Sequence, residues 1–192
     1  MALRFCILML VASMLIPQKY ILNRIFVSCM LALKPATEKD FTTIEKLART
    51  IWNKHYIPIV GEAQVNYMLD KMYAHQALQK QCEEGQQFYL VMNEEKECGF
   101  ISISTADTKN LMLHKFYILQ EKQNTGLGTL VFNKIVEELY AAQTIRLTVN
   151  RQNYKSINFY FKLGFKIEKV EDFDIGNNYY MNDFVMLWQN KK

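Results

Sequence analysis

The hydrophobic pattern of the chain changes period along its length, and this change most limits what the chain can fold into. From Ile44 to Met72 apolar residues recur at helical spacing, with an interruption at Pro58 and Gly61. Between Phe88 and Leu119 they instead follow the period of two that is typical of β-strands. Helical and strand-like segments then alternate to the end of the sequence. This combination predicts a mixed α/β domain.

The segments can be placed in the order strand, two helices, three strands, helix, strand, helix and two strands. We expect helices after the capping-box-like Thr37 and Asp40, and then at Glu62–Gln81, Thr129–Ala142 and Tyr154–Leu163. The expected strands are Leu31–Lys34, Phe88–Met92, Gly99–Ser104, Leu111–Leu119, Ile145–Val149, Phe165–Phe173 and Tyr179–Gln189. The last two strands should turn at Gly176, Asn177 and Asn178.

Composition excludes several classes of function. The chain has 192 residues, half of them apolar, which is enough for one sizeable core and a single domain. Its net charge of +4 comes from scattered basic residues, too weak a signal for a nucleic-acid partner. The four cysteines are far apart and form no CxxC pair, so neither a metal site nor a disulfide framework is expected. This cysteine usage fits a cytoplasmic protein.

The amino terminus carries an apolar run, Phe5–Ile16, that is shorter than the ~20 residues needed for a membrane-spanning helix. A secretory signal is one interpretation, although no clear cleavage site follows. A lipoprotein signal ending at Cys29 is another, but the apolar run lies far upstream of that cysteine. We favour a third, in which Met30 is the biological start and residues 1–29 are an apolar upstream extension of the reading frame. Residues 30–192 would then form the folded domain, without a membrane contact.

A glycine-containing loop lies between an expected strand and an expected helix. It reads Gln123, Asn124, Thr125, Gly126, Leu127, Gly128, Thr129. Two glycines allow a tight turn that directs several backbone amides towards one point, and the helix behind adds its partial positive end. Such a loop can hold phosphate, although an ordinary strand-to-helix turn uses glycine in the same way. The dinucleotide and nucleoside-triphosphate fingerprints both fail here, because Val131 replaces a third glycine and no Lys-Ser or Lys-Thr follows Gly128.

A second segment further along the chain gives this loop a context. It runs from Asn153 through Ser156 and Phe159-Tyr160 to Gly164-Phe165. Together the two segments resemble the GNAT superfamily of N-acetyltransferases, in motif order, in spacing and in expected secondary structure over roughly residues 31–189. The resemblance implies a mainly antiparallel sheet of about six to seven strands flanked by about four helices.

The resemblance also implies acetyl-coenzyme A as the co-substrate. Strand residues Phe116 and Ile118 would pair their backbone with its pantetheine arm. Backbone amides from Asn124 to Thr129, in the loop that starts at Gln123, would hold its pyrophosphate. Further contacts would come from the second segment, with Lys155 as a phosphate contact: Asn153, Lys155 and Ser156.

The resemblance assigns acid catalysis to Tyr160, which would donate its proton to the departing thiolate. Family members that acetylate polyamines have a glutamate nine residues before the first loop residue, where this chain has His114. An imidazole can accept a proton at neutral pH, so His114 is a candidate base, although a lone strand histidine is often structural. The acids Glu62, Glu83 and Glu84 are alternatives.

The acceptor is expected to be a small-molecule amine. The closing strands resemble those of bacterial diamine and polyamine acetyltransferases, and acids beside aromatic side chains suit a cation there: Asp172, Asp174, Asp183, Tyr179 and Tyr180. A protein amino terminus or lysine is an alternative acceptor. A coenzyme-A-binding sensor without catalysis is another hypothesis, prompted by the missing glutamate at position 114. Homodimers are common in the superfamily.

Overall fold

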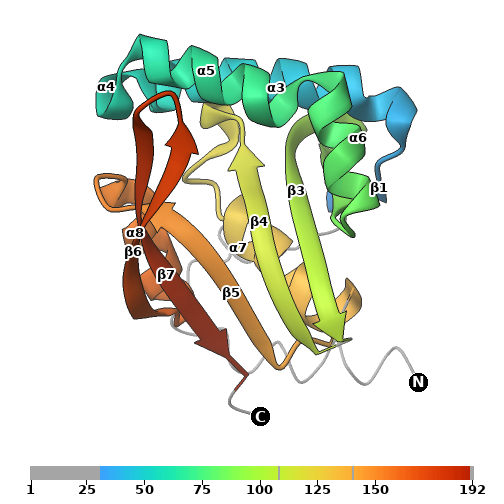
Figure 1. Ribbon diagram of the computed structural model, residues 1–192. Coiled ribbons are helices and arrows are strands. Elements are labelled where there is room, and N and C mark those ends of the chain that lie inside the picture. Colours follow the sequence, from blue (N-terminus) through green and yellow to red (C-terminus); the bar gives the residue numbers. More distant parts are fainter. Residues whose placement is uncertain (1–30, 108, 140, 191–192) are drawn as a thin grey trace, which may run out of the picture.

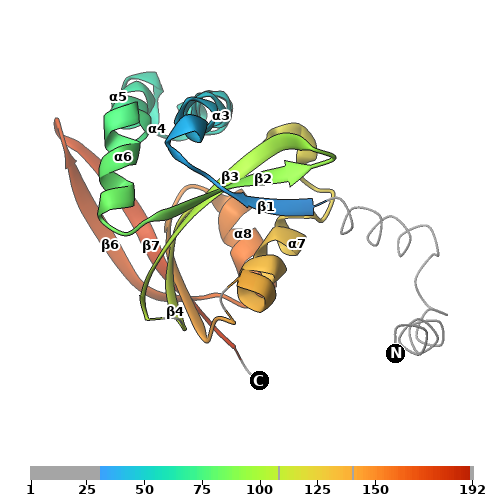
Figure 2. The same cartoon turned by 90° about the vertical axis from the view of Figure 1, so that its right-hand side faces the viewer.

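The computed structural model describes residues 31–107, 109–139 and 141–190. The expected boundary at residues 29 and 30 lies outside this part of the chain. The described elements form one central sheet with helices on both of its faces (Figure 1, Figure 2). Of the helices described, none has the length and hydropathy that crossing a bilayer requires.

The sheet has seven strands in the order β1-β2-β3-β4-β5-β7-β6. Every neighbouring pair is antiparallel except β4 and β5, which are parallel. The strands are β1 (Leu31–Pro35), β2 (Gln87–Asn93), β3 (Lys96–Asp107), β4 (Asn110–Ile118), β5 (Thr144–Asn150), β6 (Lys166–Gly176) and β7 (Tyr179–Gln189). The expected mixed fold with a mainly antiparallel sheet is confirmed.

The helices are more numerous than the four or so expected. They are α3 (Phe41–His55), α4 (Ile57–Val60), α5 (Glu62–Tyr73), α6 (His75–Glu83), α7 (Leu127–Lys134) and α8 (Tyr154–Leu163). The expected helix from Glu62 to Gln81 is interrupted because Ala74 has an extended backbone, with ψ of 148°. The side chain of Gln81 bridges this break by donating to the carbonyl of Met72 at 2.8 Å.

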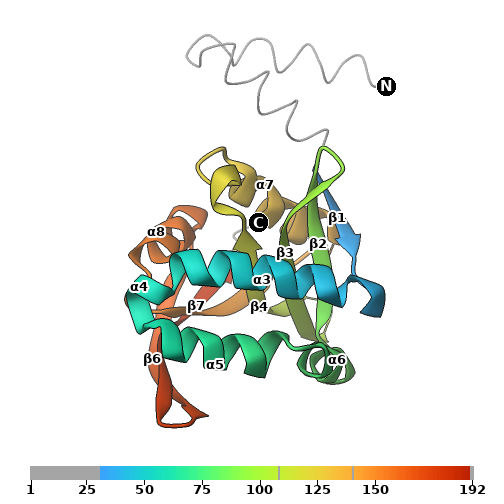
Figure 3. The ribbon, with the colours of Figure 1, turned by 90° about the horizontal axis from the view of Figure 1, so that it is seen from above.

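Two hydrophobic cores lie on opposite faces of the sheet. On one face α3, α5 and α6 pack against the sheet, with Ile44, Leu69 and Phe100 fully buried between them. On the other, α7 and α8 bury Val131 and Ile157 against β4 and β5. Figure 3, seen from above, shows α3 and α5 side by side across the top of the sheet. Helices therefore cover both faces of the sheet.

The sheet opens where β4 and β5 separate. The two strands pair over three positions only, from Asn110 opposite Thr144 to Met112 opposite Arg146. Beyond Met112, β4 continues to Ile118 without β5 beside it, and β5 pairs with β7 on its other side. Figure 1 shows the two strands diverging towards the helices α3 and α5. The divergence leaves one edge of β4 unpaired at the centre of the protein.

Candidate active site

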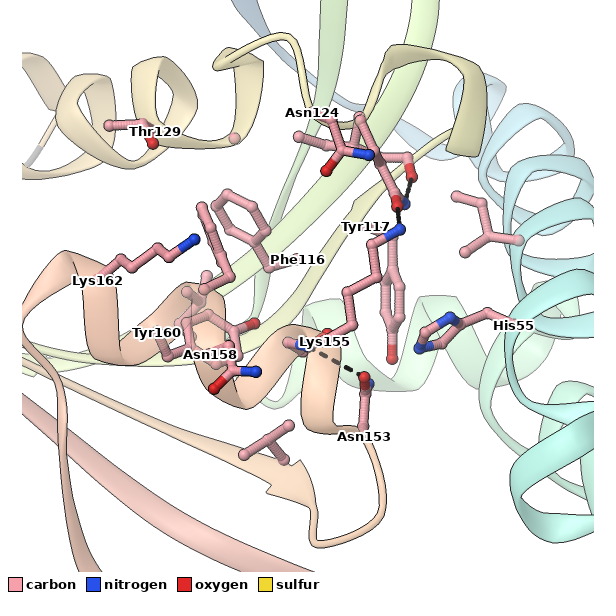
Figure 4. Close-up of a pocket in the computed structure, with 18 of the residues that line it drawn as sticks. His55, Phe116, Tyr117, Asn124, Thr129, Asn153, Lys155, Asn158, Tyr160 and Lys162 are labelled. Carbon is pink, nitrogen blue, oxygen red and sulfur yellow. Dashed lines mark hydrogen bonds between the residues drawn. The ribbon is translucent and has the colours of Figure 1, made fainter.

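A pocket with a volume of about 580 Å³, called the larger pocket below, occupies this separation. Its walls are the end of β4, the loop that precedes α7, the start of α7, and α8, while the end of α3 closes one side. Figure 4 shows side chains from three of these elements, Phe116, Asn124 and Tyr160, around one space. The pocket therefore lies at the unpaired edge of β4.

The loop between β4 and α7 has two residues with left-handed backbone, Asn124 with φ of 61° and Gly126 with φ of 85°. Helix α7 begins at Leu127, so the amides of its first turn have no acceptor within the helix. Gly128 and Thr129, in that first turn, line the pocket. A Cβ on Gly128 would lie 3.1 Å from the ring of Phe159, so the first turn of α7 approaches α8 closely. These features are typical of a helix terminus that can bind an anion.

Gln123 fixes the start of this loop. Its Nε2 donates to the carbonyl of Ile118 at 2.7 Å, and its Oε1 accepts a hydrogen bond from Lys155 Nζ at 2.6 Å. The loop is therefore tied both to the end of β4 and to α8. Lys155 and Lys162 both line the larger pocket and add positive charge beside the loop (Figure 4).

Asn153 caps α8 and is only 2 % exposed. Its Oδ1 accepts a hydrogen bond from the backbone N–H of Ser156 at 3.2 Å, as an N-cap side chain does. Its Nδ2 donates to the hydroxyl of Tyr56 at 3.3 Å. The residue lines the pocket, but its amide already has partners within the protein.

Tyr160 lies on α8 and is buried among aromatic rings, with Phe159 and Phe165 at centroid distances of 5.5 and 5.4 Å. Its side chain lines the larger pocket. Burial, and then the nearby Tyr56, raises the pKa of its hydroxyl. The hydroxyl is therefore protonated at neutral pH and can act as a proton donor.

His114 lies on β4 and lines both the larger pocket and a smaller one. The side chain is accessible to solvent, and its Nε2 is 2.6 Å from the hydroxyl of Ser104. Desolvation by the surrounding protein, and then the positive charge of Lys115, lowers its pKa. The imidazole is therefore neutral at pH 7, and it is a weaker base than an ordinary histidine.

The smaller pocket has a volume of about 300 Å³ and lies beneath α3 and α5. Its wall includes aromatic and sulfur-containing side chains, among them Trp52, Met68, Tyr73 and Met181. Two buried charged residues also line it, Lys115 from β4 and Asp183 from β7. The residues shared with the larger pocket are Tyr56, His114, Tyr117, Thr148 and Val149. The two pockets therefore meet where β4 and β5 separate.

Tyrosine hydroxyl groups gather at this junction. Tyr56 and Tyr73 both form side-chain hydrogen bonds with Tyr117. Desolvation is the main cause that raises the pKa of each of these hydroxyls. All three groups are therefore uncharged at neutral pH, and they surround the junction with hydroxyl donors and acceptors.

A family model for the acetyltransferase (GNAT) domain matches residues 57–176. The chain belongs to this family. The matched region contains the loop before α7, the whole of α8 and the unpaired edge of β4. It ends before β7, so Asp183 lies outside it.

Two curated relatives show how far the sequence similarity extends. The chain is 26 % identical over 144 residues to the spermidine N(1)-acetyltransferase of Thermoplasma acidophilum, an alignment that covers 71 % of this chain and 88 % of that protein. It is 30 % identical over 91 residues to an uncharacterized N-acetyltransferase of Mycobacterium tuberculosis. That alignment covers 46 % of this chain, and the chain spans 58 % of the mycobacterial protein.

Solved structures share the fold. The PaiA N-acetyltransferase of Thermoplasma acidophilum, in complex with coenzyme A, has a TM-score of 0.66 at 23 % identity, covering 83 % of this chain and 99 % of that one. The spermidine N-acetyltransferase of Vibrio cholerae, in complex with coenzyme A and spermine, has a TM-score of 0.60 at 17 % identity, covering 84 % and 96 %. At these identities the likeness extends to the fold alone.

The structure brings most of the expected site residues together. The expected residues that line the larger pocket are His114, Phe116, Ile118, Gln123, Asn124, Gly126, Gly128, Thr129, Asn153, Lys155, Ser156 and Tyr160. Thr125 and Leu127 are not among its lining residues, since Leu127 packs into the core and the Thr125 hydroxyl donates to the Lys122 carbonyl. Of the alternative bases, Glu62, Glu83 and Glu84 line neither pocket.

Only one of the acids and tyrosines expected to bind the amine at the closing hairpin lines a described pocket. Asp183 lines the smaller pocket, whereas Asp172, Asp174, Tyr179 and Tyr180 line neither. Three lining residues had no sequence signal that singled them out, namely His55, Tyr56 and Tyr117. His55 and Tyr56 belong to the end of α3, which meets the pocket only through the tertiary fold. Desolvation lowers the pKa of His55, which also faces the Asn153 side chain.

Proposed function

We propose that the chain is an acetyl-coenzyme A-dependent N-acetyltransferase that acts on a primary amine of a small molecule. The observation that carries the proposal is the meeting of two pockets where β4 and β5 separate, with Tyr160 in the wall of the larger one. One pocket has an anion-binding loop and the other has a buried acid. A two-substrate transfer needs this kind of arrangement, because the reacting groups must come together while water is kept out.

The residues of the larger pocket fit coenzyme A. The unpaired edge of β4 at Phe116 and Ile118 offers backbone groups to an extended amide-containing arm. The amides from Asn124 to Thr129 would hold the pyrophosphate, and Lys155 and Lys162 would add charge. Asn153 and Ser156 line the same pocket and would contact coenzyme A further along its length. Bound acetyl-coenzyme A supplies a thioester carbonyl that an amine can attack.

Tyr160 is our candidate for the general acid. Its buried hydroxyl is protonated at neutral pH, so it can give its proton to a leaving thiolate. His114 lines both pockets, and we place it beside the reacting amine. Its lowered pKa makes it a weak acceptor of a proton from an ammonium group.

We further propose diamines and polyamines as the first acceptors to examine. Support comes from the named activities of the Thermoplasma and Vibrio relatives and from the buried Asp183 in the smaller pocket.

A cytoplasmic location and assembly into a homodimer are also part of the proposal. Cell fractionation and light scattering of the purified protein test these two points.

The deciding experiment is an acceptor screen on the purified full-length protein. Acetyl-coenzyme A is supplied with spermidine, 1,4-diaminobutane, an amino sugar, and peptides with a free amino terminus or lysine, and the release of free thiol is followed. Saturable release with small amines supports the proposal. Turnover confined to peptides would instead identify a protein acetyltransferase. Tight coenzyme A binding in calorimetry without turnover on any acceptor would indicate a coenzyme-A-binding sensor.

A further inference from the structure

Asp183 is a buried carboxylate that opens onto the smaller pocket. It lies on β7 opposite Asn150 of β5 and is 5 % exposed. Thr148 of β5 forms a side-chain hydrogen bond with it. Thr148 lines both pockets, so this hydrogen bond places the carboxylate beside their junction.

Among the residues that the structure describes, Asp183 has no ion-pair partner. The positive charge of Arg151 lowers the pKa of Asp183, but the Arg151 guanidinium is bonded to Asp172. A buried charge without a partner is costly, because desolvation is not offset by attraction. Such a group in the wall of a pocket is suited to a cationic ligand that completes the pair.

Asp183 differs from the other candidate bases, His114 and His55, in its pKa and in the pocket that it lines. Desolvation raises the pKa of Asp183 to about 6, which makes it a better proton acceptor than an ordinary aspartate. The shift at His114 is in the opposite direction and weakens that imidazole as a base. His55 lines only the larger pocket, on the side of the loop and α8.

Building on the proposed acetyltransferase function, we propose that Asp183 is the catalytic carboxylate that binds the ammonium group of the acceptor and removes its proton. One N–H bond of the ammonium breaks and one O–H bond forms on the Asp183 carboxyl group. The nitrogen keeps the electron pair of the broken bond and becomes a neutral amine able to attack. The proton leaves Asp183 for solvent after the product departs.

Other charged and titratable groups around Asp183 set its response to pH. Arg151, which directly follows β5, lowers the pKa of Asp183, and Asp172 of β6 raises it. Glu171 of β6 stands opposite it in register, and Tyr56, at the end of α3, is electrostatically coupled to it. The titratable residues of β4 that share its pocket are His114, Lys115 and Tyr117. Of these groups, Lys115 is a cation that lines the same pocket as Asp183. Its positive charge repels a cationic ligand in that pocket.

The test compares Asp183→Asn with the wild-type protein and with Glu168→Gln as a matched control. Glu168 pairs with Arg146 at 2.8 Å and lines neither pocket, so its substitution removes a carboxylate from the neighbouring strand without touching the site. We expect Asp183→Asn to lower kcat/KM for spermidine or 1,4-diaminobutane by about a hundredfold. Its affinity for coenzyme A should stay within about twofold of wild type. Glu168→Gln should match wild type in both.

The pH profile adds a readout that a structural role would not affect. In the wild type, kcat/KM should fall as the pH drops through about 6, because protonated Asp183 neither holds nor deprotonates the ammonium. That acidic limb should be absent from the residual activity of Asp183→Asn. An unchanged limb, or kcat/KM within about threefold of wild type, overturns the assignment.

Amine binding without acetyl transfer separates this inference from the proposed function. Trp52 lines the smaller pocket, so its fluorescence can follow titration with 1,4-diaminobutane in the presence of coenzyme A. Binding to the wild type that weakens at least about tenfold in Asp183→Asn supports the ammonium site, even if no acceptor turns over. Wild-type turnover with unimpaired Asp183→Asn overturns the inference alone. A wild type that binds no amine overturns it as well.

Discussion

The side chain of Asn153 joins helix α8 to Tyr56, at the end of α3, through a hydrogen bond of 3.3 Å to the tyrosine hydroxyl. The same side chain caps α8 by accepting from the N–H of Ser156 at 3.2 Å. One amide therefore stabilises a helix and positions a tyrosine at the junction of the two pockets.

Asn153→Ala should remove both interactions and lower the free energy of unfolding by about 1–2 kcal/mol. Asn153→Ser keeps a hydroxyl that can cap the helix but is too short to reach Tyr56, so it should recover most of the stability. Urea unfolding of the three proteins gives the comparison. Equal stability of wild type and Asn153→Ala would show that the cap contributes nothing.

Tyr160→Phe should lower kcat by about a hundredfold, because it removes the proton donor and leaves the ring in place. The aromatic contacts with Phe159 and Phe165 do not need the hydroxyl, so stability and coenzyme A affinity should change little. Steady-state kinetics with saturating acetyl-coenzyme A and a responsive amine provide the measurement. A variant with full turnover would exclude Tyr160 as the acid.

Gly126→Ala should weaken coenzyme A binding by about tenfold, because a side chain with φ near 85° costs about 1–2 kcal/mol and shifts the loop. Gly61→Ala is a matched control, since Gly61 has φ of 84° and also has no atom within 4 Å of an added Cβ. Both variants should lose similar stability, but only Gly126→Ala should lose affinity in calorimetry. If Gly61→Ala lost as much affinity for coenzyme A as Gly126→Ala, the loss would reflect general destabilisation of the fold and not a local change in the loop.

Sequence patterns predicted the parts of the fold that depend on local signals. Helix α8 has the expected bounds because Asn153 caps its start and Gly164, with φ of 96°, ends it. The closing hairpin turns where expected because Asn177 and Asn178 adopt positive φ. The loop before α7 has a local signal of the same kind, because Gly126 adopts a positive φ and Gly128 lies close to the ring of Phe159.

The remaining features depend on contacts that no local signal encodes. Ala74 interrupts the expected second helix without a proline or glycine, while Val65 and Leu78 on either side pack into the same core. Tyr56 reaches Asn153 across 97 residues of sequence. The sequence offered Asp172, Asp174 and Asp183 as equivalent acids, and only the packing of β7 against β5 buries one of them in a pocket.

Lys115→Met should strengthen the binding of diamines by about threefold to tenfold. Lys115 is 8 % exposed and lies near the rings of Phe88 and Tyr73, at 5.2 and 5.6 Å. Desolvation lowers its pKa to about 8, so it remains mainly protonated at pH 7 and repels a cation in the same pocket. The control Lys80→Met removes an exposed lysine of α6. Fluorescence titration at pH 7 measures the effect, and weaker diamine binding in Lys115→Met would contradict it.

Asp183→Asn should make the folded protein more stable at pH 8, although it impairs the proposed reaction. The folded-state pKa of about 6 is above the ordinary value of 3.8, so between these values the folded protein binds more protons than the unfolded chain. Stability from this group is therefore lost as the pH rises from about 4 to 6, by up to about 3 kcal/mol. An asparagine can still bond Thr148 but carries no charge, so the gain over wild type should be small near pH 4 and largest above pH 6.

Urea unfolding of both proteins at intervals from pH 4 to 8 measures this difference. A stability gain that grows with pH, together with lost turnover, shows that a destabilising charge is retained for its chemistry. If Asp183→Asn were less stable than wild type at pH 8, the carboxylate would instead be a structural partner of Thr148 and Arg151. In that case its effect on activity would follow from a disturbed β5–β7 pairing, and the acidic limb of the pH profile would have to arise from another group.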